Sequence, residues 1–179
     1  MDFSDVIRFW FDETDSAKWF SVDPAFDATI SEKFATIHRA ATRGELFRWR
    51  KNALGRLAEI VVLDQFSRNM FRNNPAAFAS DTLALVLAQE AVALNIQADL
   101  SAAQKAFLFM PFMHSESIVI HDVAVTLFSD PELKWNLEFE FKHRAIIERF
   151  GRYPHRNAIV GRVSTAEEVE FLRQPGSSF

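Results

Sequence analysis

The sequence contains no cysteine and only one tyrosine among its 179 residues. Without cysteine, disulfides and thiolate metal ligands are excluded, and a reducing compartment suits the chain. Only five glycines interrupt it, and alternating hairpin patterns of β-branched residues are absent. The first residues are acidic where a secretory signal would be basic, and we expect no apolar run long enough to span a bilayer. We therefore predict a cytoplasmic protein with no membrane contact.

Hydrophobic residues make up 49% of the chain, and nineteen of them are phenylalanine. This length and composition suit one domain over residues 1–179 with a single large core. Apolar residues recur with a spacing near 3.6 along most of the chain, which is typical of helices. We predict an all-α fold of about eight or nine helices, stacked as antiparallel pairs because the connections are short.

Capping signals predict where several helices begin and end. Asp23-Pro24 has the residues of an N-cap and first helical position, and Gly151 suits a left-handed helix end. Ser164 or Thr165 begins a capping-box pattern. The predicted helices cover roughly residues 3–12, 24–41, 47–72, 81–95, 102–111, 113–128 and 131–150, followed by two short ones.

Charge is distributed unevenly around a net value of −4. Residues 1–32 carry a net charge of −6, whereas residues 39–72 and residues 142–162 each carry +5. If the two basic stretches meet in space, they make a local positive field inside an acidic protein. A nucleic-acid-binding protein is more often basic overall with a long exposed stripe, so we predict no nucleic-acid partner.

The stretch Leu63–Arg72 places polar residues along one arc of a predicted helix. Asp64, Arg68 and Arg72 share this arc, and Gln65 and Asn69 lie beside them. Polar groups that continue an apolar stripe could border a ligand cavity, so these five residues are candidate ligand-binding residues. The alternative is an Asp64–Arg68 pair within the helix and a solvated stripe of amides.

The segment after Pro111 offers a possible acid–base pair. His114, Ser117 and His121 are expected to share one helical face, with Glu116 alongside. Two imidazoles about two turns apart are too distant to chelate one metal ion, so we predict neither a metal site nor a cofactor. If chemistry occurs here, His114 and Glu116 are the candidate catalytic residues. Alternatively, the histidines are core residues that donate to backbone carbonyls.

The loop after Phe150 concentrates hydrogen-bonding side chains. Arg152, His155 and Arg156 lie in a segment stiffened by Pro154, and the only tyrosine of the chain is among them. The planar guanidinium groups of the two arginines match a carboxylate or phosphate. The two arginines and the neighbouring His155 are therefore also candidate ligand-binding residues. The alternative is a structural loop, since cations are favourable near a helix C-terminus without any ligand.

Five motifs, in this order and over nearly the whole chain, resemble the bacterial family known as domain of unknown function 924. The resemblance implies an all-helical fold similar to right-handed tetratricopeptide-repeat superhelices. It implies no established reaction, cofactor or partner. The motifs are Phe9-Trp10-Phe11, the stretch 63–72, Ala77-Phe78-Ala79-Ser80-Asp81, Phe112-Met113-His114-Ser115-Glu116 and the stretch 150–157.

Three functional hypotheses follow from these residues. In the first, the two basic stretches and His114 converge on a groove that binds a small anionic molecule or an acidic peptide end. In the second, the helices form a tetratricopeptide-like scaffold for protein partners, and the polar clusters only fix the register of the helices. This second hypothesis predicts exposed aromatic patches and no enclosed polar cavity. In the third, the protein is a hydrolase that uses His114 and Glu116.

Overall fold

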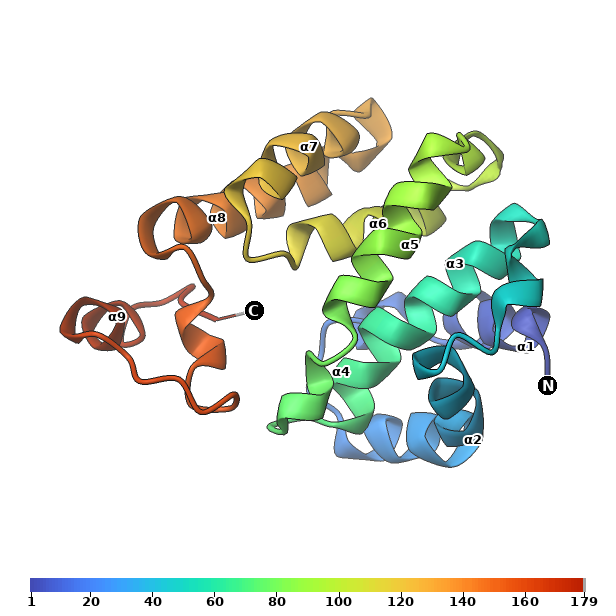
Figure 1. Cartoon of the computed structure of the whole chain (residues 1–179), viewed down its shortest axis with the longest axis horizontal. Helices are drawn as coiled ribbons and strands as arrows, with labels where there is room; N and C mark the ends of the chain where they lie inside the picture. The colour runs from blue at the N-terminus through green and yellow to red at the C-terminus, as the bar shows by residue number, and fades with distance from the viewer. Residues whose placement is uncertain (179) are drawn as a thin grey trace. The chain divides into compact units, whose positions relative to one another are not determined.

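The computed structural model in Figure 1 describes residues 1–178, and none of these residues lies in a β-strand. The predicted all-α fold is therefore confirmed. Contacts between Cα atoms divide the chain into two compact units. Unit 1 comprises Met1–Arg72 and Ala76–Pro111, and unit 2 comprises Asn73–Pro75 and the chain from Phe112 onward. One domain over the whole chain, and a superhelical arrangement of its helices, stay predictions.

Unit 1 is built from helices that alternate with short 3₁₀ and π segments. Helix α1 packs against α3, α2 against α4, and α3 against α5. The α-helices are α1 (Phe3–Ile7), α2 (Pro24–Thr42), α3 (Ala53–Val61), α4 (Ser67–Met70), α5 (Asp81–Ala93) and α6 (Ala102–Met113), and α6 crosses the boundary into unit 2. The π segments are Arg8–Glu13 and Val62–Phe66, and the longest 3₁₀ segment is Phe47–Lys51.

The start of α2 follows the predicted capping chemistry. The Asp23 carboxylate accepts hydrogen bonds from the Ala25 and Phe26 N–H groups, at 3.0 and 3.1 Å. The predicted long helix over residues 47–72 is instead interrupted. Helix α3 begins only after Asn52, whose side chain accepts from the Gly55 N–H at 2.9 Å. A Cβ atom at Gly55 would overlap the Trp49 carbonyl oxygen, so only glycine fits this close turn.

Aromatic rings fill the core of unit 1. Trp10 has no exposed surface, and its ring lies 5.5 Å from that of Phe66 and 5.5 Å from that of Phe107. Trp10 belongs to one π segment and Phe66 to the other, so the two segments face each other across this core. A π segment carries one extra residue per turn, which re-aims the side chains that follow it. The second π segment contains the candidate residues Asp64 and Gln65.

Unit 2 contains the antiparallel pair of α7 (Ile118–Phe128) and α8 (Lys134–Phe150), joined by a short turn and packed along their lengths (Figure 1). Gly151 ends α8 with a φ of 65°, the left-handed cap expected from the sequence. The short helix α9 (Ala166–Phe171) begins with the predicted capping box between Thr165 and Glu168. These boundaries confirm the capping predictions for the second half of the chain.

The predicted helix over residues 113–128 is wrong at its start. Helix α6 continues through Pro111 to Met113, and α7 begins only at Ile118. His114 and Ser117 therefore precede the helix, and they do not share a helical face with His121. The reason lies in tertiary contacts: the carbonyl oxygen of Met113 accepts from the Tyr153 hydroxyl at 2.6 Å, which favours an irregular segment here.

The segment Pro75–Ala93 has the length of a membrane-spanning helix, with 19 residues and a mean hydropathy of 1.3. On composition alone, the expectation that no such run exists fails at this segment. Its regular part is α5, which packs through buried alanines against α3. A core helix of a soluble protein has the same properties, so this is weak evidence for a membrane span. The compact helical packing suits a soluble protein, and the cytoplasmic location stays a prediction.

Candidate functional site

Arg68 is bound by two acidic residues of unit 1. Its guanidinium donates to the two carboxylate oxygens of Asp81 at 2.9 and 3.0 Å. The same group lies 3.1 Å from the Asp64 carboxylate and donates to the Asp64 carbonyl at 2.8 Å. The i, i+4 pair considered from the sequence is therefore present, and Asp81 extends it from α4 to the start of α5. This arrangement ties the two helices together.

Arg72 and Asn69 share a single acceptor on α2. Arg72 donates from two nitrogens to the Asp27 carboxylate, at 2.7 and 2.9 Å, and the Asn69 amide donates to the same carboxylate at 2.8 Å. These hydrogen bonds raise the pKa of Arg72, although partial burial works against them. Asp27 lies 42 and 45 residues away in the sequence from its two partners. The contact fastens the end of α4 to α2.

Gln65 completes the first polar stretch. Its amide nitrogen donates to the Asp64 carboxylate at 2.5 Å and lies 3.4 Å from the Met110 sulfur. Gln65 is buried, and Asp64 is 1% exposed. Two of the five candidate residues of this stretch thus bind each other inside unit 1, which is the arrangement of a structural hydrogen-bond network.

His38 of α2 is buried in unit 1. Its Nε2 lies 2.8 Å from the Ser67 hydroxyl, which itself donates to the Leu63 carbonyl at 2.6 Å. Burial lowers the pKa of His38. Because the Ser67 proton is already used, the pair is a structural link and not an activated nucleophile. Phe34, four residues before His38 on the same face of α2, was the signal for burial.

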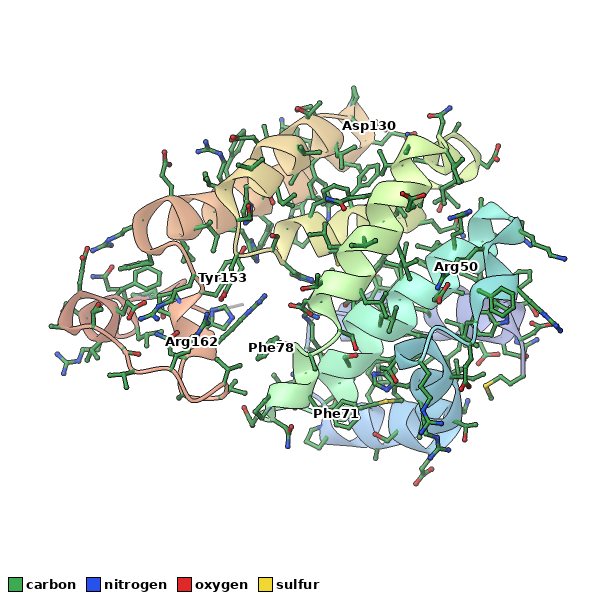
Figure 2. All side chains as sticks on the ribbon, in the orientation of Figure 1. Arg50, Phe71, Phe78, Asp130, Tyr153 and Arg162 are labelled. Carbon is green, nitrogen blue, oxygen red and sulfur yellow. The ribbon has the colours of Figure 1, made fainter. Side chains whose placement is uncertain are left out.

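Glu116 is held by an arginine that the sequence did not single out. The Arg162 guanidinium donates to both oxygens of Glu116, at 2.6 and 2.8 Å, and the Tyr153 N–H donates to Glu116 at 2.9 Å. Burial works to raise the pKa of Glu116, but these hydrogen bonds outweigh it and lower the pKa. Figure 2 shows Tyr153 and Arg162 in the segment that follows α8. A carboxylate held in this way is a weak proton acceptor.

Arg152 forms a second two-point ion pair in unit 2. It donates to the two oxygens of Glu168 at 2.6 and 2.7 Å and to the Val163 carbonyl at 3.1 Å. The hydrogen bonds from Arg152 lower the pKa of Glu168 to about 2. Glu168 also closes the capping box of α9 through the Thr165 N–H at 2.7 Å. Arg152 therefore connects the end of α8 to α9.

Tyr153 is the centre of the polar cluster in unit 2. Its side chain has no exposed surface, and its hydroxyl lies 3.2 Å from the His121 Nε2. The Arg156 guanidinium stacks 4.5 Å from the centre of the tyrosine ring and donates to the His114 carbonyl at 3.1 Å. The rings of His155 and His143 lie 5.5 and 5.8 Å from the tyrosine ring. Four of the five histidines of the chain thus gather here.

A buried acid and imidazole link α8 to α7. Glu140 Oε1 lies 2.6 Å from His121 Nδ1, and neither residue is exposed. The Nε2 of His121 faces the Ser115 carbonyl at 2.9 Å, which can only accept, so this nitrogen carries a proton. Burial raises the pKa of Glu140, and the hydrogen bond from His121 partly offsets this effect. Glu140 was missed because nothing in its local sequence marks it as buried.

Each stretch of candidates is brought together within its own unit. Among the residues that the structure describes, no group of three or more His, Asp or Glu side chains is placed to hold a metal ion. Convergence of the two basic stretches on one groove stays a prediction. Unit 1 contains Asp64, Gln65, Arg68, Asn69 and Arg72, and unit 2 contains His114, Glu116, Arg152, His155 and Arg156.

The comparisons with known proteins agree with the sequence motifs. Residues 6–176 match the family described as bacterial protein of unknown function, DUF924. The chain belongs to this family. It is also 38% identical to a solved protein of unknown function, ATU0120 from Agrobacterium tumefaciens, over 95% of this chain and 96% of that one, with a TM-score of 0.90. No curated protein matches the chain. The predicted family is confirmed, and no activity comes with it.

Proposed function

We propose that this protein is a helical scaffold that binds a partner protein, and that its polar clusters hold the helices in register. The observation that carries the proposal is an exposed apolar set on the pair α7–α8. Val119 and Val123 on α7 are 67% and 43% exposed, and Phe141 on α8 is 52% exposed. Large apolar side chains that are exposed together are a common sign of a protein-binding surface.

The contacts between α7 and α8 place these three residues at the same level along the helix pair. His121 binds Glu140, and Asp122 lies 3.0 Å from Arg144, so residues 119–123 run alongside residues 140–144. Val119 and Val123 are separated by one helical turn and share a face. Phe141 follows Glu140 on α8, so it lies at the same level along the helix pair as the two valines.

The ion pairs in both units favour the scaffold over an arginine-lined anion site. Arg72 and Arg152 each direct two nitrogens at one carboxylate, and Arg68 does the same with Asp81. A guanidinium that already donates from two nitrogens to a carboxylate offers fewer donors to an anionic ligand. A network of this kind fixes how helices pack, which suits a rigid interaction surface.

The test is capture of a partner from a bacterial lysate after chemical crosslinking, with two matched double variants. Val123→Ser with Phe141→Ser removes two of the three residues of the exposed apolar set, and Val86→Ser with Leu94→Ser removes two residues of similar exposure on and after α5. We expect the wild type and the control to capture the same protein, and the first variant to lose it. Equal capture by both variants, with both folded by circular dichroism, would contradict the proposal.

A second candidate function, binding of a small anion, is favoured by the cluster around Tyr153. Arg156 is only 7% exposed while its cation stacks on the tyrosine ring beside His155. A buried guanidinium among imidazoles suits a phosphate or carboxylate group. Thermal unfolding with inorganic phosphate, sulfate and citrate tests this function. We expect stabilisation of the wild type that Arg156→Gln lacks, and no stabilisation by any of the three anions would contradict it.

A further inference from the structure

The segment from Arg39 to Arg56 forms a basic surface in unit 1. Among the residues that the structure describes, only one of its cations is in an ion pair: Arg50 donates to both oxygens of the buried Glu59, at 2.6 and 2.7 Å. The one acidic residue of the segment is Glu45. The cations outside that pair, together called the basic patch, are Arg39, Arg43, Arg48, Lys51 and Arg56, and all except Arg56 are exposed.

The basic patch includes Arg48, which lies beside an exposed phenylalanine on an ordered turn. Phe47 is 59% exposed, and the Arg48 guanidinium lies 5.8 Å from the centre of its ring. The residues on either side hold the backbone in place, because Leu46 is buried and the Trp49 ring contacts the Phe3 ring at 6.3 Å. An apolar side chain among fixed cations can receive a partner that carries both negative charge and an apolar group.

We propose that the basic patch and Phe47 form a docking surface for a short acidic peptide segment of a partner protein, with an apolar side chain of that segment packing on Phe47. The inference rests on the proposed scaffold function and specifies the chemistry of the partner. Charge complementarity argues for this occupant, since four of the five cations are exposed and one of them, Arg48, lies beside the exposed Phe47 ring. Arginines predominate, and their planar groups match carboxylates in two-point hydrogen bonds.

The neighbourhood of the patch favours a short peptide over a long polyanion or an anionic bilayer. The five-residue 3₁₀ segment Phe47–Lys51 is about 10 Å long at a rise of about 2 Å per residue, which equals about three residues of an extended peptide. The Phe3–Trp49 contact places α1 beside this segment, and carboxylates lie at the N-cap of α1 (Asp2) and within it (Asp5). A surface that extended over α1 would meet like charges.

The probe is a fluorescent synthetic peptide of roughly twelve residues that repeats the unit Glu-Glu-Leu, and fluorescence anisotropy measures its affinity for the full chain. The double variant Arg48→Glu with Lys51→Glu should weaken binding about tenfold or more, since two attractions become repulsions. Lys134→Glu with Lys142→Glu makes the same charge change on α8 and should change the affinity less than about twofold. Added salt should weaken the wild-type complex by screening.

Two further probes separate charge from the apolar contact. A peptide with Gln in place of Glu should bind at least about tenfold more weakly, and Phe47→Ala should weaken the acidic peptide about threefold to tenfold. Equal weakening by the basic patch variant and the α8 control would overturn the inference. Tighter binding of a single-stranded oligothymidine, or of vesicles rich in phosphatidylglycerol, than of the acidic peptide would also overturn it.

Failure of the peptide-docking inference can be told apart from failure of the scaffold proposal. If the peptide does not bind but partner capture still depends on Val123 and Phe141, the scaffold function stands and only the basic patch is misassigned. If partner capture shows no dependence on α7–α8, the scaffold proposal itself fails, and specific peptide binding would then stand only as an isolated activity of unit 1.

Discussion

Glu140 and His121 meet with their Oε1 and Nδ1 atoms 2.6 Å apart, and both side chains are completely buried. The contact fixes the level at which α8 lies against α7. It also orients His121, whose other nitrogen faces the Ser115 carbonyl. Loss of either side chain leaves the other buried without its partner.

Removal of Glu140 should therefore be far more costly than its neutralisation. We expect Glu140→Ala to lower the free energy of unfolding by about 3–5 kcal/mol, since His121 loses a buried partner. Glu140→Gln keeps a donor facing Nδ1 and should cost about 1–2 kcal/mol. Urea unfolding followed by circular dichroism measures both values. Equal losses for the two variants would show that the hydrogen bond contributes little.

His143 should make stability depend on pH below neutrality. Burial lowers the pKa of His143 to about 3, whereas an unfolded histidine titrates near 6.5. Between these two pKa values the unfolded chain binds more protons than the folded chain. The contribution of neutral His143 to the free energy of unfolding is therefore complete above about pH 6.5 and is lost as the pH falls. The difference in free energy of unfolding between the wild type and His143→Gln should be about 2–3 kcal/mol smaller at pH 4.5 than at pH 7.5. A gap that does not change with pH would contradict a buried neutral His143.

Asp27 should act as the fastening point between α2 and α4. Asp27→Ala removes the acceptor of three hydrogen bonds from Arg72 and Asn69 and should cost about 1–3 kcal/mol of unfolding free energy. Arg72→Ala should cost no more in the Asp27→Ala background than about 0.5 kcal/mol, because the two residues act together. Additive losses in this double-mutant cycle would rule out the proposed coupling.

Local signals in the sequence were sufficient to predict three of the helix ends. Asp23, Gly151 and Thr165 act at the positions that their chemistry requires, because capping depends only on residues within one turn. The π segment Val62–Phe66 gave no such signal. It depends on how the ring of Phe66 packs against Trp10, a contact between distant parts of the chain.

The sequence also indicated which side chains are unusual, but not what they bind. Arg72 was selected because it lies on a polar arc that continues an apolar stripe, and Arg152 because it lies in a loop rich in hydrogen-bonding side chains. Both have carboxylate partners outside their own segment. Glu116 was selected as a base, yet its partner Arg162 is 46 residues away. Contacts of this kind follow from tertiary packing, which residue spacing within one helix does not reveal.

Photocrosslinking at position 141 shows whether the exposed residues of α7–α8 bind a protein. Benzoylphenylalanine replaces Phe141 in one variant and Leu94 in the control, since both residues are more than half exposed. After irradiation in bacterial cells, the scaffold function predicts one discrete crosslinked protein at position 141 and none at position 94. No adduct at position 141, or the same adducts at both positions, would contradict the claim.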